Sequence, residues 1–209
     1  VGIMSNGTSG NTGAIRKDGK KYEPFEWIKV SGRLLAAETI KTIQTIEHRA
    51  DISLQVVQSE LLLGVRKPDA ARIKWAQGVL DNPGVKQAHN WTTVYANETL
   101  HLSRYPDQKS IILQAIRLGD IAIAAAPCEV FAETGLAIKG RSPFLKTFTI
   151  ELANGYGGYL PSPEQHKLGG YETWPARSSF LELEAEPKIQ QAMVNLLKQL
   201  TMPKKNNGK

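Results

Sequence analysis

The sequence has a single cysteine, Cys128, among its 209 residues. One cysteine cannot form a disulfide within the chain and cannot supply a Cys-x-x-Cys metal site. The four histidines form no His-x-His or His-x-x-x-His pair, so no local zinc-ligand pattern is present. No apolar run approaches the roughly 20 residues that a membrane-spanning helix requires. These absences exclude an internal disulfide and a local metal motif, and they leave the cellular compartment undecided.

The chain carries a net charge of +6 at pH 7, which raises the question of a nucleic-acid partner. Much of the positive excess lies in two runs, residues 16–21 and 204–209, whose composition favours a solvated loop and a solvated tail. No RNP motif, helix-turn-helix pattern or basic aromatic stripe accompanies them, so we expect no nucleic-acid partner. With 41% hydrophobic and 22% charged residues, the composition is that of an ordinary globular domain.

The most informative stretch lies between residues 121 and 172. The apolar run at residues 121–126 predicts a buried strand that stops at a proline, which has no N–H for the ladder. Glu129 follows where this strand meets the first turn of a helix, because residues 129–139 have helical spacing and Gly140 is placed to end it. Alternation at residues 146–152 predicts a second strand, which leads into a glycine-rich loop at residues 154–159. Open α/β sheets place their sites at such strand ends.

The remaining patterns predict an α/β fold of mixed β-sheets covered by amphipathic helices. Residues 110–118 and 121–126 flank a Gly-Asp pair and predict a β-hairpin. Residues 1–4 predict a strand that runs into a loop rich in glycine, serine and asparagine, either an anion-binding nest or a surface turn. The other expected helices span residues 31–50, 68–80, 93–103 and 187–200. Ser31 is expected to cap the first of these, and the second has a proline in its first turn. The other expected strands are 51–57, 60–65 and 178–184.

Three motifs in this sequence resemble those of one enzyme family. They are Pro127-Cys128-Glu129 at a strand end, Asn154-x-Tyr156-x-x-Tyr159, and Tyr171 twelve positions after the second tyrosine. The combination is similar to the catalytic domain of the neutral/alkaline ceramidases, zinc amidases that split N-acyl sphingosine into sphingosine and a fatty acid. Ser9-Gly10-Asn11 lies where the family has an active-site Ser-Pro-Asn, with glycine in place of the proline.

The resemblance implies a zinc-dependent amide hydrolase that acts on N-acyl sphingosine or a related N-acyl lipid. By resemblance, Glu129 and Tyr159 bind the zinc together with two histidines upstream of Val1. Tyr171 helps to bind or polarise the substrate carbonyl, and Ser9 is either a nucleophile or a group that orients the carbonyl. Residues 1–202 are then the C-terminal part of one hydrolase domain, with residues 203–209 as a disordered tail. The family further implies a secreted, periplasmic or cell-surface location and leaves peripheral membrane contact open.

Each of these residues also has a purely structural interpretation. Glu129 is favoured by the macrodipole in the first turn of a helix. Tyr156 and Tyr159 can serve as packed rings, and Tyr171 as a core hydroxyl with a hydrogen-bond partner. Cys128 is either a nucleophile or, more in keeping with the family's glycine at this position, a buried small residue.

Two further alternatives concern the site as a whole. His166 lies between Tyr159 and Tyr171 in sequence and is either an outer group of the site or an exposed loop histidine. A catalytically silent relative, which binds a ligand or partner through the same loops, is the competing function.

Overall fold

The computed structural model describes residues 3–13, 18–82, 84 and 90–201, in two compact units. The smaller unit, Gly13–Ile52, contains helix α1 (Glu26–Ile43), in which no residue is buried. The sequence placed this helix at residues 31–50, but Ser31 lies inside it and does not cap it. Residues 26–30 are compatible with a helix, and an interior serine does not interrupt one.

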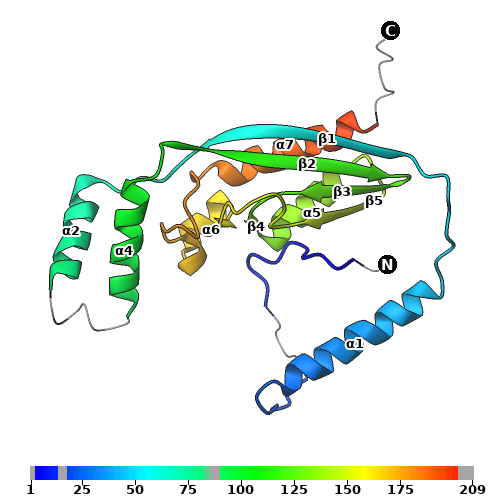
Figure 1. Ribbon diagram of the computed structural model, residues 1–209, viewed down its shortest axis with the longest axis horizontal. Helices are drawn as coiled ribbons and strands as arrows, with labels where there is room; N and C mark the ends of the chain where they lie inside the picture. Colours follow the sequence, from blue (N-terminus) through cyan, green and yellow to red (C-terminus); the bar gives the residue numbers. More distant parts are fainter. Residues whose placement is uncertain (1–2, 14–17, 83, 85–89, 202–209) are drawn as a thin grey trace, which may run out of the picture. The chain divides into compact units, whose positions relative to one another are not determined.

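The larger unit, Val1–Thr12 with Ser53–Lys209, is built on a four-stranded mixed sheet (Figure 1). The strand order is β1-β2-β3-β5, with antiparallel pairs at β1–β2 and β2–β3 and a parallel pair at β3–β5. Gly119, with a φ of 63°, forms the predicted hairpin turn between β2 and β3. The strands are β1 (Leu54–Gly64), β2 (Gln108–Leu118), β3 (Ile121–Ala125) and β5 (Lys146–Ile150).

The sequence predicts two separate strands, 51–57 and 60–65, where the structure has the single strand β1. It pairs with β2 without interruption from Leu54 to Gly64. Of the two polar residues between the predicted runs, Gln58 is accommodated by a cross-strand bond, since the Gln114 side-chain amide donates to Gln58 Oε1 at 2.7 Å. The buried Ser59 hydroxyl has no hydrogen-bond partner among the described residues.

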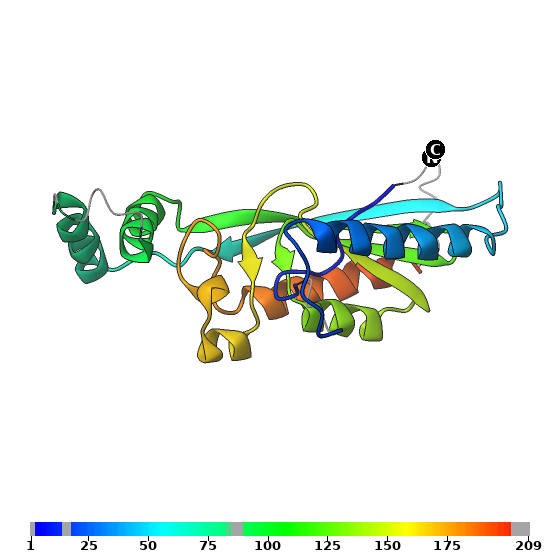
Figure 2. The ribbon, with the colours of Figure 1, turned by 90° about the horizontal axis from the view of Figure 1, so that it is seen from below.

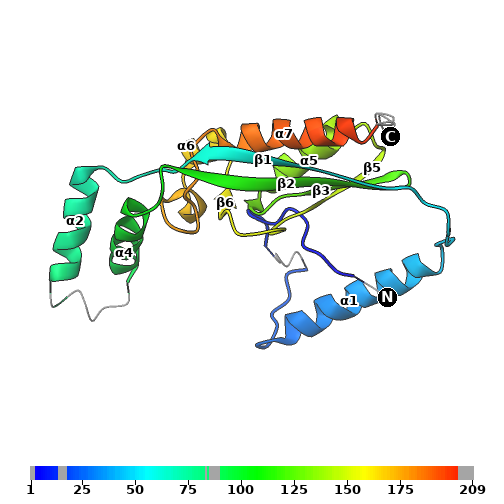
Figure 3. The ribbon, with the colours of Figure 1, turned by 45° about the horizontal axis from the view of Figure 1, so that its top comes forward.

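Two helices pack on the sheet and on each other (Figure 3). Helix α5 (Ala132–Arg141) lies between β3 and β5 in the chain and so forms the crossover that a parallel pair needs. Helix α7 (Ala185–Gln199) packs along β1 and β2 through its predicted apolar stripe, in which Ile189, Met193 and Leu197 are buried. The mixed α/β architecture predicted from the sequence is confirmed.

A helical hairpin of α2 (Ala70–Asp81) and α4 (Trp91–Ser103) lies at the end of the long β1–β2 ribbon (Figure 2). Pro68 was expected in the first turn of α2, but Asp69 caps the helix by accepting from the Arg72 N–H, so the proline precedes the cap. Helix α4 begins earlier than predicted because Asn90 caps it by accepting from the Thr93 N–H.

Two predicted strands are absent from the described structure. Ile3 and Met4 are exposed and lie in no strand, and residues 178–184 form only isolated bridges. The latter segment meets the end of β1 in one antiparallel bridge between Val65 and Leu181, with hydrogen bonds from Arg66 N–H to the Phe180 carbonyl and from Glu182 N–H to the Gly64 carbonyl. The predicted tail and the predicted turn at Pro83 lie outside the described residues.

The remaining short elements are β4 (Glu129–Val130), β6 (Tyr159–Leu160), α6 (Pro163–Leu168) and the 3-10 helix η1 (Tyr171–Thr173). None of the described helices is long and apolar enough to cross a membrane.

Replacing Leu197 with alanine is expected to lower the free energy of unfolding by about 2–5 kcal/mol, because this side chain is fully buried where α7 meets the sheet. Chemical denaturation of the full-length protein would measure the change. Leu136→Ala, at an exposed position of α5, is the matched control and should change it by less than about 0.5 kcal/mol. Equal effects of the two substitutions would contradict the assignment of α7 to the core.

Candidate active site

Strands β4 and β6 bring two of the family-like motifs together. They pair in parallel, with Glu129 opposite Tyr159, and the Glu129 N–H donates to the Gly158 carbonyl at 2.9 Å. Glu129 therefore lies in a strand, and α5 begins only at Ala132 with Phe131 as its N-cap. The prediction that Glu129 belongs to the first turn of the helix is wrong in this detail, so the macrodipole does not account for its position.

The glycines of the 154–159 loop permit this close pairing. A Cβ atom on Gly157 would lie 2.6 Å from the Cys128 sulfur, and Gly158 adopts a φ of +71°. Burial, with the charges of Glu129 and Glu151 as smaller causes, raises the pKa of the Cys128 thiol to about 12. A buried, protonated thiol is not a nucleophile at neutral pH, so the structure favours Cys128 as a small packing residue.

Tyr156 and Tyr159 lie beside the Glu129 carboxylate, and Tyr171 contacts Tyr159. The Tyr156 hydroxyl donates to Glu129 Oε1 at 3.1 Å, and the Tyr159 and Tyr171 hydroxyls are 3.5 Å apart with their rings edge to face. Tyr156 and Tyr171 are 54% and 52% exposed, so neither is a core ring. The arrangement is a carboxylate with phenol groups on an accessible surface. Tyr156, for which the sequence predicts no role in catalysis or metal binding, is one of these phenols.

The electrostatics of these phenols are set by their neighbours. Burial, followed by the Glu129 charge, raises the pKa of Tyr156 to about 12. The hydrogen bond with Tyr171, then burial and the Glu129 carboxylate, raise the pKa of Tyr159 above its ordinary value. Both hydroxyls are therefore protonated near neutral pH in the chain alone, and both can donate hydrogen bonds.

The loop with Ser9 docks on the same strand. The Gly10 N–H donates to the Val130 carbonyl at 2.9 Å, and the Asn11 side chain accepts from the Ala132 N–H at 2.9 Å. A Cβ atom on Gly10 would lie 2.3 Å from the Glu129 carbonyl oxygen. A side chain at position 10 would therefore clash with the β4 backbone, and the docked loop places Ser9 beside the strand that carries Glu129.

Glu151, which sequence reasoning did not single out, holds Ser9 in place. This carboxylate is only 4% exposed. It accepts the Ser9 hydroxyl, the Ser9 N–H at 3.1 Å and the Val130 N–H at 3.0 Å. The sequence signal that could have identified Glu151 is a carboxylate at the end of an apolar strand. The alternating pattern at residues 146–152 made Glu151 look like an ordinary strand residue.

His166 lies in α6 and is half-buried, so it is not an exposed loop residue. Burial and the nearby Arg66 charge lower the pKa of His166.

The donors at this site fit a zinc ion in part. The Glu129 carboxylate is an ordinary zinc ligand, whereas the protonated Tyr159 phenol must lose its proton before it can bind. Among the described residues, no group of three or more His, Cys, Asp or Glu side chains could hold a metal ion. Glu129 and Tyr159 thus supply two oxygen donors, and a complete tetrahedral set needs further ligands.

No protein-family model matches the chain, and no curated protein matches its sequence. The structure of neutral ceramidase from Pseudomonas aeruginosa matches with a TM-score of 0.59 and 17% identity over 94% of this chain. The chain has the fold of part of a neutral ceramidase. It spans 36% of that ceramidase chain. A structure described as a ceramidase complexed with C2 matches with a TM-score of 0.51 and 16% identity, over 82% of this chain and 34% of its own. The ceramidase resemblance drawn from the sequence motifs is thus confirmed at the level of the fold.

Proposed function

We propose that this chain is part of a ceramidase-like hydrolase that cleaves the amide bond of N-acyl sphingosine or a related N-acyl lipid. The observation that carries the proposal is the β4–β6 pairing, which sets Tyr159 opposite Glu129. Tyr156 donates to the same carboxylate, and the Tyr171 hydroxyl lies 3.5 Å from that of Tyr159. The Ser9 loop docks on the same strand, within a ceramidase fold. The products would be a fatty acid and an amine.

In this proposal Glu129 and Tyr159 would hold a zinc ion, together with two histidines from upstream of Val1. Such an ion lowers the pKa of a bound water and polarises a carbonyl. The exposed Tyr171 hydroxyl donates a hydrogen bond to the oxygen of the substrate amide. Glu151 fixes the direction of the Ser9 O–H bond, so the lone pairs of Ser9 are free either to attack the carbonyl carbon or to orient the substrate.

Zinc binding by Tyr159 requires loss of the phenol proton, and the raised pKa makes this loss unfavourable in the chain alone. Metal binding should therefore release a proton, and zinc affinity should increase with pH. Loss of part of this proton release in Tyr159→Phe would separate a phenolate ligand from a phenol that merely lies near the ion, because histidine ligands and zinc-bound water release protons in both proteins.

Release of fatty acid from N-acyl sphingosine by the full-length protein is expected to stop after chelation and to return when zinc is restored. Tyr159→Phe should reduce zinc content and turnover together, because phenylalanine offers no oxygen. Tyr105→Phe, a tyrosine whose ring packs on Phe180, is the control and should retain both.

Turnover that survives complete chelation would contradict the zinc-dependent proposal. A folded protein that contains zinc but releases no fatty acid would support the metal site and contradict the proposed substrate, so other amides would be assayed next. A folded protein with neither zinc nor turnover would favour the silent relative that binds a ligand or partner.

A further inference from the structure

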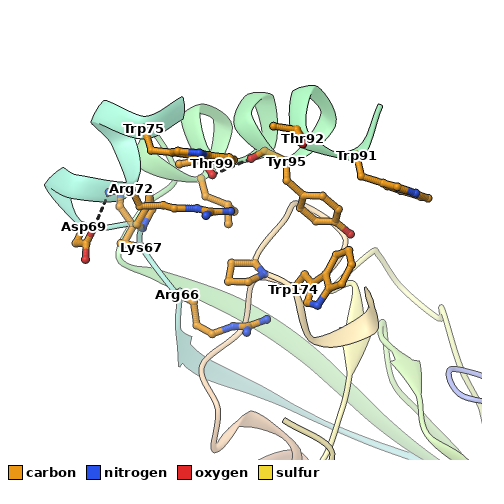
Figure 4. Close-up of a pocket in the computed structure, with 13 residues that line it drawn as sticks. Arg66, Lys67, Asp69, Arg72, Trp75, Trp91, Thr92, Tyr95, Thr99 and Trp174 are labelled. Carbon is orange, nitrogen blue, oxygen red and sulfur yellow. Dashed lines mark hydrogen bonds between the residues drawn. The ribbon is translucent and has the colours of Figure 1, made fainter. Parts of the chain in front are cut away.

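A cavity of about 700 Å³ lies between α2, α4 and the loop that follows η1 (Figure 4). Its volume is within the range of small-molecule sites. None of the candidate active-site residues Ser9, Glu129, Tyr159 and Tyr171 lines it. The cavity is therefore a separate feature of the larger unit.

Aromatic side chains form one wall of this cavity. Three of the four tryptophans of the sequence line it, together with Tyr95. The rings of Tyr95 and Trp174 meet edge to face at 5.0 Å, and those of Trp91 and Tyr95 are 6.2 Å apart. Trp91 and Trp174 are 70% and 44% exposed, so this wall presents a large apolar area to solvent. Such an exposed cluster is typical of a surface that binds a ligand.

Two guanidinium groups form the opposite wall. Figure 4 shows the side chains of Arg66 and Arg72 directed toward the space that Tyr95 and Trp174 border. Among the described residues, no carboxylate forms an ion pair with either arginine. The one carboxylate in the lining, Asp69, is engaged in capping α2 through the Arg72 backbone N–H. The lining thus holds three cations, Arg66, Lys67 and Arg72, against the single carboxylate of Asp69, so its net charge is positive.

The Arg66 guanidinium is fixed by hydrogen bonds and still has unpaired N–H donors. Its guanidinium donates to the carbonyls of Thr173 and Ser179 and to the Ser179 hydroxyl. A guanidinium has five N–H donors, and the buried Nε of Arg66 has no partner among the described residues. Burial also lowers the pKa of Arg66 to about 10, so its positive charge is poorly solvated. An anion beside the guanidinium in the cavity would offset this cost.

Arg72 complements this group from the helix side. Its guanidinium stacks on the Trp75 ring, 3.9 Å from the ring centroid, which fixes its plane while leaving its edge available. A neutral sugar would cover the aromatic wall but leave both arginines without an anion. Inorganic phosphate would pair with the arginines but leave the aromatic wall exposed. A ligand with both an anionic end and an apolar body would pair with the arginines and also cover the aromatic wall.

We propose that this cavity binds a small amphipathic anion, a carboxylate or phosphate carried on an alkyl chain or ring. The anionic group lies between Arg66 and Arg72, and the apolar body lies against Trp91, Tyr95 and Trp174. The inference is independent of the proposed hydrolase activity.

Calorimetric titration of the full-length protein with octyl phosphate and with octanoate, both as monomers, tests the proposal. Arg72→Gln should weaken binding by roughly tenfold or more, because it removes a charge-assisted contact. Trp91→Ala should weaken it several-fold through loss of apolar contact. Both side chains are exposed, so neither substitution endangers the fold. Lys74→Gln, which removes an exposed cation of the same helix outside this cavity, should leave binding unchanged.

Four results would overturn the proposal. They are equal binding of the uncharged octyl glucoside, equal binding of inorganic phosphate, an equal effect of Lys74→Gln, and no binding of either octyl anion. Vesicles of phosphatidylcholine with and without phosphatidylglycerol form the last arm. If neither octyl anion binds, binding to the anionic vesicles would assign the surface to a membrane.

Discussion

Replacing Glu129 with glutamine in the full-length protein is expected to reduce turnover of the N-acyl substrate by about a hundredfold or more. The substitution keeps the shape of the side chain and the Glu129 backbone pairing with Gly158 but removes the negative charge. Zinc content should fall with turnover, because a neutral amide is a poor replacement for a carboxylate ligand. The melting temperature should change little, since this side chain is only half-buried.

The same variant has a readout that needs neither metal nor substrate. The Glu129 charge contributes to the raised pKa of Tyr156, because a carboxylate disfavours a nearby phenolate. Removing that charge should lower the pKa of Tyr156, while burial keeps it above the ordinary value. Absorbance titration of tyrosinate at alkaline pH would measure this shift by comparison with Tyr156→Phe.

Glu164→Gln is a suitable control because this glutamate is exposed and lies in the first turn of α6. It should change neither turnover nor zinc content. Normal turnover in Glu129→Gln would remove Glu129 from the catalytic machinery and leave it as a group that orders the tyrosines.

Elements whose signals are local could be predicted from the sequence. Strand β3, the hairpin turn at Gly119 and the apolar stripe of α7 depend on residues that lie close together in the chain. Their side-chain periodicity and turn chemistry were sufficient. The same is true of the spacing that related Glu129, Tyr159 and Tyr171 to the ceramidases.

Features that depend on a distant partner could not be predicted. Strand β4 has two residues and exists only because β6 pairs with it. The role of Glu151 depends on Ser9, which lies 142 positions away in the sequence. The aromatic cavity likewise requires Trp91 and Trp174 to meet around Tyr95. A single sequence carries no local signal for such contacts, since each residue alone has an ordinary structural interpretation.

Replacing Glu151 with glutamine is expected to affect both stability and turnover. The carboxylate accepts three hydrogen bonds, from the Ser9 hydroxyl, the Ser9 N–H and the Val130 N–H. Glutamine has one oxygen acceptor, and its amide NH₂ would face a donor. The free energy of unfolding should therefore fall by about 1–3 kcal/mol. Turnover should fall by roughly tenfold or more, mainly in kcat, because Ser9 loses the group that orients its hydroxyl.

A double substitution separates these two effects. If Glu151 acts on turnover through Ser9, adding Glu151→Gln to Ser9→Ala should lower turnover little beyond the Ser9 change alone. Its cost in stability should persist, because the Val130 N–H still loses its charged acceptor. Glu186→Gln is the matched buried control, since Glu186 is 6% exposed and accepts from the Thr134 hydroxyl. That variant should lose stability without a change in kcat. Additive losses of turnover in the Ser9 and Glu151 variants would instead make Glu151 a structural support for β4, and Ser9 would have to act without it.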